Sequence, residues 1–127
     1  MAQRKKTLHK SFKHPGGFIG LPQMVFWSDP YRDLTLVARC LLDEFQAIYR
    51  KGRNGRIVLS VATASQRLNT SYKPVSRAFA ELAEHGFIEC TKGSNWKDGK
   101  TREWRLTYEP CEGREPTHDW KLWEKQK

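Results

Sequence analysis

Residues 60–88 of the chain read SVATASQRLNTSYKPVSRAFAELAEHGFI, and this stretch predicts two short helices joined by a tight turn. Ser60 is a good N-cap for the first helix, because its hydroxyl can accept a hydrogen bond from a free amide of the first turn. Asn69 suits the turn, since asparagine enters the left-handed backbone region at little cost. Ser71 can cap the second helix and Gly86 can end it. The stretch is typical of a helix-turn-helix.

The second of these helices has one apolar and one polar face. Apolar residues recur at helical spacing and predict a buried stripe of Val75, Ala78, Phe79 and Leu82. Pro74 is tolerated, because amides of the first turn have no carbonyl partner within the helix. The polar face carries Ser71, Tyr72, Lys73, Ser76 and Arg77. Such a face can enter the major groove of DNA, where these side chains contact bases or phosphates; a helical hairpin with a solvated face is the alternative.

The placement of charge favours a polyanionic partner. The 127 residues have a formal net charge of +9 and a pI near 9.7. Residues 50–77 contain seven Lys or Arg and no acid, whereas residues 78–90 contain three Glu and no base. The sign changes inside the second helix, as expected for a helix that presents its N-terminal half to phosphate.

The flanking segments predict a scaffold helix and a β-hairpin. A helix from Thr35 to about Tyr49 has an apolar face of Leu34, Val37, Ala38, Leu41, Phe45 and Ile48, with Arg39, Asp43 and Gln46 toward water. Residues 56–59 predict a short strand. Residues 87–92 and 102–108 predict the two strands of a hairpin. In the second strand Trp104, Leu106 and Tyr108 are expected to point inward and Glu103, Arg105 and Thr107 outward.

The stretch at 60–88 resembles the winged helix-turn-helix family of DNA-binding proteins. The matching residues are Ser60, Ala64, Leu68, Asn69, Ser71, Val75, Arg77, Ala78, Leu82, Gly86, Phe87 and Ile88. LTLVARCLLDEF, the Arg-Asn-Gly loop and the closing WRLT look like small winged-helix proteins of bacterial plasmids and prophages, and the resemblance covers about residues 18–108. The chain departs from the family at Asn69, where Gly is usual, and at Pro74, where Thr is usual. The resemblance implies an α+β fold, with a three-helix core, a small antiparallel sheet and a wing.

The chain is expected to have three parts. Residues 1–17 are a basic arm that can follow phosphates or serve only as a solubilising tail. Residues 18–108 are the winged helix-turn-helix domain. Residues 109–127 are a C-terminal tail with a short amphipathic segment, whose Trp120, Leu122 and Trp123 are expected to dock on the domain or to make a homodimer or protein contact.

The expected DNA contacts extend beyond the helix at 72–85. The resemblance implies that the wing at 92–102 lies along the DNA backbone or in the minor groove, and Trp96 at its tip can stack on nucleic acid or pack on its own hairpin. The basic Asn-Gly turn can clamp phosphates or stay solvated. The wing residues are Lys92, Trp96, Lys97, Lys100 and Arg102, and the turn residues are Lys51, Arg53 and Arg56.

Motifs for catalysis and for metal binding are missing from the sequence. None of the four histidines pairs with a carboxylate at a known spacing, and the three cysteines form no CxxC pair. We therefore expect no enzyme, no cofactor and no metal. No apolar run approaches the roughly 20 residues of a membrane span and no signal peptide is recognisable, so a cytoplasmic location is expected.

These features together predict a sequence-specific double-stranded-DNA-binding protein. The expected role is a transcriptional regulator of a mobile element, a phage or a plasmid. A replication-initiator-type DNA-binding module on the same fold is one alternative. A phage-type inhibitor that binds a protein, for example a host defence complex, is the other.

Overall fold

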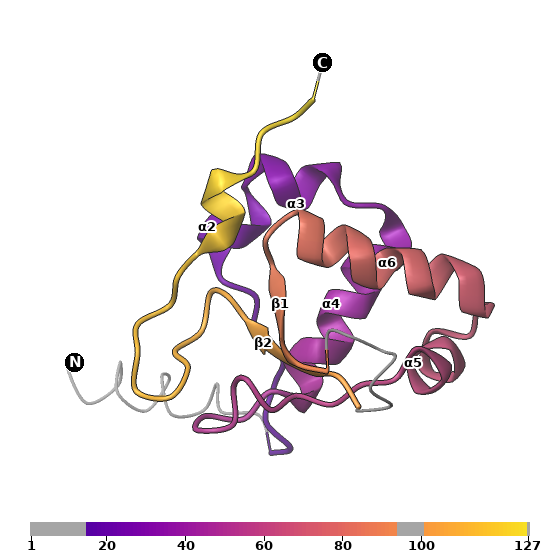
Figure 1. Ribbon diagram of the computed structural model, residues 1–127, viewed down its shortest axis with the longest axis horizontal. Coiled ribbons are helices and arrows are strands. Elements are labelled where there is room, and N and C mark those ends of the chain that lie inside the picture. Colours follow the sequence, from indigo (N-terminus) through magenta and orange to yellow (C-terminus); the bar gives the residue numbers. More distant parts are fainter. Residues whose placement is uncertain (1–14, 94–100, 127) are drawn as a thin grey trace, which may run out of the picture.

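The computed structural model describes residues 15–93 and 101–126, and in these ranges the chain is α+β with a small antiparallel sheet. The elements follow the order α2 (Gln23–Phe26), α3 (Asp29–Asp33), α4 (Leu36–Ile48), α5 (Val61–Leu68), α6 (Tyr72–Glu84), β1 (Ile88–Lys92), β2 (Glu103–Leu106) and the 3-10 helix η2 (Asp119–Leu122) (Figure 1). Most of the expected arm and the expected wing tip, with Trp96, Lys97 and Lys100, lie outside the described residues.

Helix α5 and the turn after it form through the N-cap and the left-handed residue that the sequence predicts. Ser60 Oγ accepts a hydrogen bond from the amide of Thr63 at 3.0 Å and so begins α5. Asn69 has a φ of 53° and ends the helix in the left-handed conformation. The amides of Asn69 and Thr70 then donate to the carbonyl oxygens of Gln66 and Ser65, at 3.2 and 3.1 Å. This is the Schellman pattern, with asparagine in the place of the usual glycine.

The two ends of α6 are capped differently. Ser71 occupies the N-cap position, but its side chain makes no capping hydrogen bond. The reason is that an N-cap oxygen accepts from the second or third helical amide, and the third residue here is Pro74, which has no N–H. At the other end Gly86 has a φ of +84°. The amides of Gly86 and Phe87 donate to the carbonyl oxygens of Ala83 and Leu82, at 3.1 and 3.0 Å, and complete a second Schellman motif.

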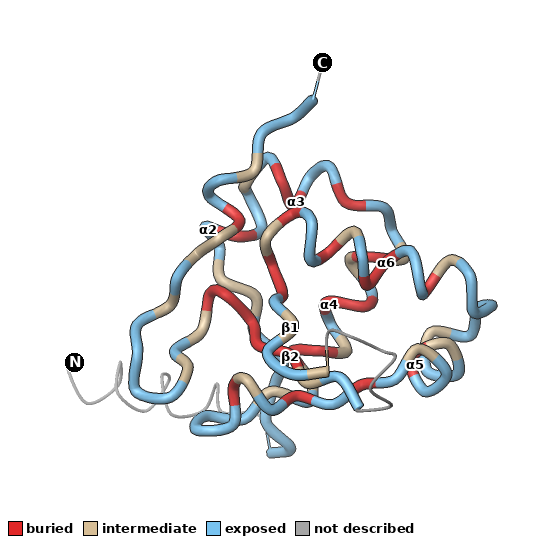
Figure 2. Tube along the Cα trace, in the orientation of Figure 1, coloured by how far each residue is buried: buried red, intermediate tan, exposed pale blue. Residues whose placement is uncertain are grey.

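The core lies where α4, α5 and α6 pack together over the sheet (Figure 2). The expected apolar stripe of α6 is buried, and Phe45 contacts Phe79 and Trp104 edge-on, with ring centroids 5.6 and 6.1 Å apart. The face predicted for α4 is wrong at two positions. Ile48, in the last turn, is 37% exposed, whereas Gln46 is buried, since the buried face of α4 extends to Leu42 one turn earlier.

The sheet is smaller than the sequence predicts. Strands β1 and β2 are antiparallel, with Cys90 opposite Trp104 and an irregularity between Cys90 and Lys92. The expected strand at 56–59 is reduced to one bridge, in which Ile57 and Trp104 exchange two backbone hydrogen bonds of 3.1 and 2.9 Å. The chain turns at Gly55, whose carbonyl accepts from Thr91 Oγ1 at 2.6 Å, and α5 begins soon afterwards.

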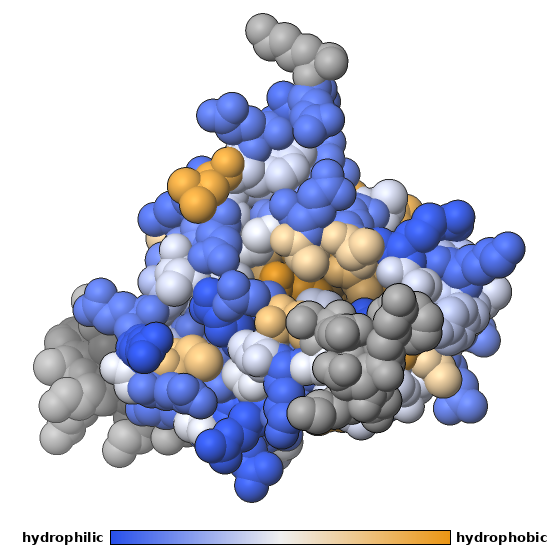
Figure 3. Space-filling view, viewed as in Figure 1, coloured by the Kyte–Doolittle hydropathy of each residue, from blue (hydrophilic) through white to orange (hydrophobic). Residues whose placement is uncertain are grey.

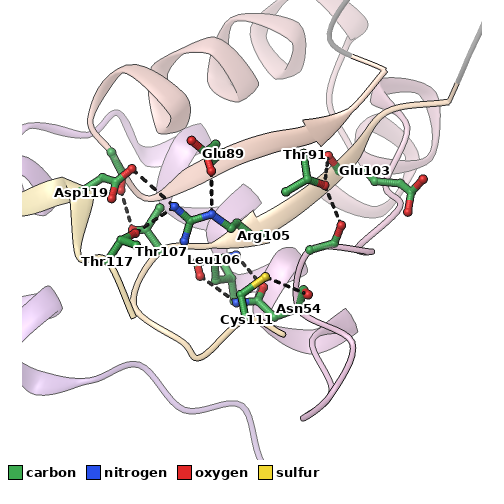
Figure 4. A network of polar contacts seen from close by, with 12 residues as sticks. Asn54, Glu89, Thr91, Glu103, Arg105, Leu106, Thr107, Cys111, Thr117 and Asp119 are labelled. Carbon is green, nitrogen blue, oxygen red and sulfur yellow. Dashed lines mark hydrogen bonds and ion pairs between the residues drawn. The ribbon is translucent and has the colours of Figure 1, made fainter. Parts of the chain in front are cut away.

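The second strand is covered on both faces, which corrects the expectation that Arg105 and Thr107 face water. Both side chains are buried beneath the C-terminal segment. Arg105 Nε lies 2.7 Å from Glu89 Oε1, and Arg105 Nη2 donates to Thr117 Oγ1 at 2.9 Å (Figure 4). Thr107 Oγ1 donates to the carbonyl of Gly86 at 2.6 Å. The guanidinium stays buried because acceptors surround it.

The three apolar residues of the C-terminal segment have different surroundings. Trp120 is only 6% exposed and stacks on Phe87, with ring centroids 6.4 Å apart. Trp123 stacks on His85 at 4.8 Å. Leu122 is 84% exposed. Trp120 is therefore taken up by the domain itself and is not free for a partner, and Leu122 remains the exposed member of the predicted contact.

Candidate nucleic-acid interface

The expected DNA-reading face of α6 is exposed along its first two turns. Its residues are Ser71, Tyr72, Lys73, Ser76 and Arg77. They lie opposite the buried stripe, as the helical period requires. Within residues 15–93 and 101–126, neither Lys73 nor Arg77 forms an ion pair or a side-chain hydrogen bond. Two unpaired cations therefore face solvent one turn apart.

The start of α6 also presents free backbone donors. Ser71 makes no capping hydrogen bond, and the amides of Tyr72 and Lys73 have no acceptor among the described residues. Free amides at a helix N-terminus carry the positive end of the helix dipole and bind anions readily. Cationic side chains and free amides thus coincide at this end of the helix.

The base of the β-hairpin lies beside the start of α6. Tyr72 and Arg102 both line a hollow of about 370 Å³, which the first turn of α5 also borders. Arg102 is exposed and has no ion-pair partner in the described part of the chain. Lys92 differs, because its Nζ lies 3.6 Å from Glu103 Oε2 and its charge is partly compensated within the hairpin.

Acidic residues near this surface are engaged inside the protein. Glu81 accepts from the backbone amide of Thr35 at 2.6 Å and from its hydroxyl at 2.9 Å, so it binds the N-cap residue of α4. Glu89 pairs with Arg105, and Glu44 pairs with Arg67. Glu81 thus has a structural role that the sequence did not reveal, because Thr35 lies 46 residues earlier in the chain, whereas Glu84 is exposed and has no partner among the described residues.

The basic Asn-Gly turn is a separate feature. Lys51, Arg53 and Arg56 are exposed, whereas Asn54 between them is only 3% exposed. Its amide nitrogen donates to the carbonyls of Leu106, Glu109 and Pro110 at 2.9–3.1 Å, and its oxygen accepts from the amide of Leu106 at 2.8 Å (Figure 4). The turn projects at the lower left of Figure 1, while α6 begins at the far right. The structure therefore does not bring the turn together with the start of α6.

The groups with perturbed acidity lie away from this surface. Burial raises the pKa of Tyr31, Asp43, Tyr49, Tyr108 and Glu109. All five are on or beside α4 and the end of β2. The exposed face of α6 thus offers cations, hydroxyls and one aromatic ring, which suit recognition of charge and of hydrogen-bonding edges.

In the part of the chain that the structure describes, positive and negative side chains are nearly equal in number. A local excess of cations is therefore a property of one surface and not of the whole described part. Residues 1–14, 94–100 and 127 carry eight of the 23 Lys and Arg but one of the 14 acids. The face shown in Figure 3 is mostly hydrophilic, with apolar atoms near its centre and a separate apolar group that stands out at the upper left. Ala83, Ile88 and Cys90 line a hollow between α6 and β1. Lys73 and Arg77 are among several exposed cations without an ion-pair partner in the described ranges, together with Lys51, Arg53, Arg56 and Arg102.

Comparisons with known proteins give no relative. The chain matches no family model, no curated protein and no solved structure. Among the residues that the structure describes, no three His, Cys, Asp or Glu side chains are grouped so that they could hold a metal ion. No helix in the same ranges is both long and apolar enough to cross a bilayer.

Proposed function

We propose that the protein binds double-stranded DNA sequence-specifically through a winged helix-turn-helix and acts as a transcriptional regulator of a mobile element. One observation carries the proposal. Lys73 and Arg77 are unpaired and exposed on the first half of α6, while the nearby acids Glu81 and Glu89 are bound to other parts of the protein.

The arrangement of the elements supports the winged-helix part of the proposal. Helices α4, α5 and α6 pack together, the hairpin of β1 and β2 follows α6 directly, and Ile57 bridges to the free edge of β2. This is the order of elements that the family resemblance implies. The wing is then the connection between Lys92 and Arg102.

The first two turns of α6 would lie in the major groove, which admits one α-helix. Arg77 and Lys73 can donate to the N7 and O6 atoms of guanine, and Ser76 can contact a base edge. The free amides of Tyr72 and Lys73, with Arg102 on the hairpin, would contact phosphates. Phosphate contacts supply affinity that falls steeply with salt, and base contacts supply sequence preference.

The proposal is tested by selecting bound sequences from a pool of random duplexes and measuring the affinity of the protein for the most enriched duplex. Arg77→Ala is expected to weaken binding to the selected duplex by about 1–3 kcal/mol, because a bidentate base contact is lost. Arg114→Ala is the matched control, since Arg114 is equally exposed but lies in the C-terminal segment. A pool that yields no preferred sequence, or equal losses for the two variants, would contradict sequence-specific reading by α6.

A further inference from the structure

The hollow between Tyr72 and Arg102 has the composition of a site for a flat ring. Its volume is about 370 Å³, which lies within the roughly 300–1,000 Å³ of ligand sites in proteins. Three aromatic rings from two elements border it: Tyr72 at the start of α6, Phe79 deeper on α6 and Trp104 on β2. The remaining wall is residues 59–62, which lead into α5, with Thr101 on the side of the hairpin. A planar ring placed there would exchange water for aromatic and aliphatic contacts.

The floor and the rim of the hollow differ in polarity. Phe79 and Trp104 are 3% and 5% exposed and form the floor. The indole N–H of Trp104 is buried with no acceptor among the described residues. At the rim Tyr72 is 59% exposed, and the Arg102 guanidinium is also exposed. A ring with acceptor atoms on its edge and an attached phosphate matches this combination.

We infer that this hollow receives one unstacked nucleobase of the DNA bound on α6. The inference rests on the proposed function, because the phosphates on either side of that base would be held by Lys73 and Arg102. Proteins that take a base out of the stack hold it between aromatic or apolar side chains, and an unpaired base costs least to extract. The protein therefore prefers duplexes in which one base is already unpaired.

The position of the hollow fits this role. Residues at the start of α6 and at the base of the hairpin both line it, so a duplex contacted by both elements would lie beside it. A base that left the stack at that point would move toward Tyr72. Stacking on an aromatic side chain favours any base, so the preference is for an unpaired base and not for a particular sequence.

The experiment compares three short duplexes of one sequence by fluorescence anisotropy. One is fully paired, one carries a single bulged 2-aminopurine, and one carries an abasic bulge at the same place. The protein is expected to bind the base bulge about tenfold more tightly than the abasic bulge, and stacking should quench the 2-aminopurine fluorescence. Equal affinity for the two bulges would overturn the inference. Failure to bind any of the three duplexes would overturn the proposed function with it.

Two variants separate the hollow from the cationic surface. Ala62→Trp fills the hollow from α5 and is expected to abolish the preference for the base bulge while leaving affinity for the paired duplex unchanged. Gln66→Trp is the matched control, because Gln66 is exposed on the same helix and does not line the hollow. If Ala62→Trp still bound the base bulge more tightly than the abasic bulge, the hollow would not be the site of the base.

Substitutions of Tyr72 repeat the test without enlarging a side chain. Tyr72 is exposed, so its replacement leaves the core intact. Tyr72→Phe keeps a ring for stacking and should keep the preference and the quenching, whereas Tyr72→Ala should lose both. If the two variants showed the same preference for the base bulge and the same quenching, Tyr72 would not belong to the site and the proposed stacking would be contradicted.

Discussion

The two halves of α6 show opposite uses of one helix. In the first half Lys73 and Arg77 face solvent without partners, and the N-terminal amides are free. In the second half Glu81 binds Thr35, and His85 lies with its ring nitrogens 2.8 Å from the Glu81 carbonyl and from Asp33 Oδ2. The C-terminal half holds other elements in place, and we propose that the N-terminal half binds the partner.

This difference predicts how substitutions divide between stability and binding. Changes at the C-terminal end of α6 should lower the free energy of unfolding. Changes at the N-terminal end should alter binding and leave stability almost unchanged, because surface substitutions away from specific contacts usually stay within about 0.5 kcal/mol. A substitution that moved both quantities equally would break the comparison.

The largest effect is expected at the C-terminal end, for Gly86→Ala. Gly86 has a φ of +84°, and a Cβ there would lie 2.6 Å from backbone atoms of Asp119 and Trp120. Backbone strain and the clash with the C-terminal segment together should cost about 3 kcal/mol or more of unfolding free energy, measured by urea denaturation.

Gly113→Ala is the control for that loss. Gly113 also has a positive φ, of +76°, but a Cβ there meets nothing within 4 Å. Strain alone should then cost about 1 kcal/mol. If the two variants were equally destabilised, the packing of the C-terminal segment on Gly86 would not contribute.

The next effect is at the N-terminal end, for the double variant Lys73→Ala with Arg77→Ala. Both cations are exposed and unpaired, so thermal and urea stability should change by less than about 0.5 kcal/mol. Affinity for DNA should fall by more than tenfold at low salt, with a shallower dependence on salt, because two phosphate or base contacts are lost. A loss of stability comparable to the loss of affinity would show that the two residues are structural.

A smaller effect is expected for an acidic residue in the C-terminal half of α6. Glu81→Ala removes two hydrogen bonds to the N-cap residue of α4, which should cost about 1 kcal/mol of unfolding free energy. DNA affinity should not weaken, because the lost charge is negative. Glu84→Ala is the matched control, since Glu84 is exposed and has no partner in the described ranges; its stability should match the unaltered protein in the same denaturation.

The smallest effect is expected at Tyr108, which lies outside α6. Burial raises the pKa of Tyr108 well above its ordinary 10.0, and its hydroxyl has no hydrogen-bond partner among the described residues. The folded state holds this proton more tightly than the unfolded state does. Stability is therefore full below about pH 10 and falls as pH rises toward the folded-state value.

Tyr108→Phe removes this ionisation and an unsatisfied hydroxyl. The variant should be as stable as the unaltered protein at neutral pH, or slightly more so, and should lose less stability than the unaltered protein when urea unfolding is repeated above pH 10. An unchanged alkaline loss in the variant would assign the effect to other groups.

Local signals predicted the helices well. The caps at Ser60 and Asn69 and the stop at Gly86 depend on residues within one turn, so they can be read from neighbouring sequence. The buried stripe of α6 follows from helical period alone. Ser71 shows the limit of this reasoning, because its capping role depended on Pro74 three residues later.

Contacts between distant segments were not predictable in this way. Arg105 and Thr107 alternate as outward residues of a strand, and nothing nearby indicates that Thr117 and Asp119 return to cover them. Asn54 reads as a turn residue, but it is buried through bonds to residues more than 50 positions away. The polar face of α6 was predicted, whereas the separation of the Asn-Gly turn from it required the three-dimensional arrangement.

The most direct test of the central claim is residue-resolved mapping of the DNA contact by amide chemical shifts. The labelled protein is titrated with the duplex recovered by selection. Changes should be centred on Tyr72, Lys73, Ser76 and Arg77, with a second group at Arg102. Changes confined to the Asn-Gly turn or to η2, with α6 unaffected, would contradict the claim that the unpaired first half of α6 is the nucleic-acid interface.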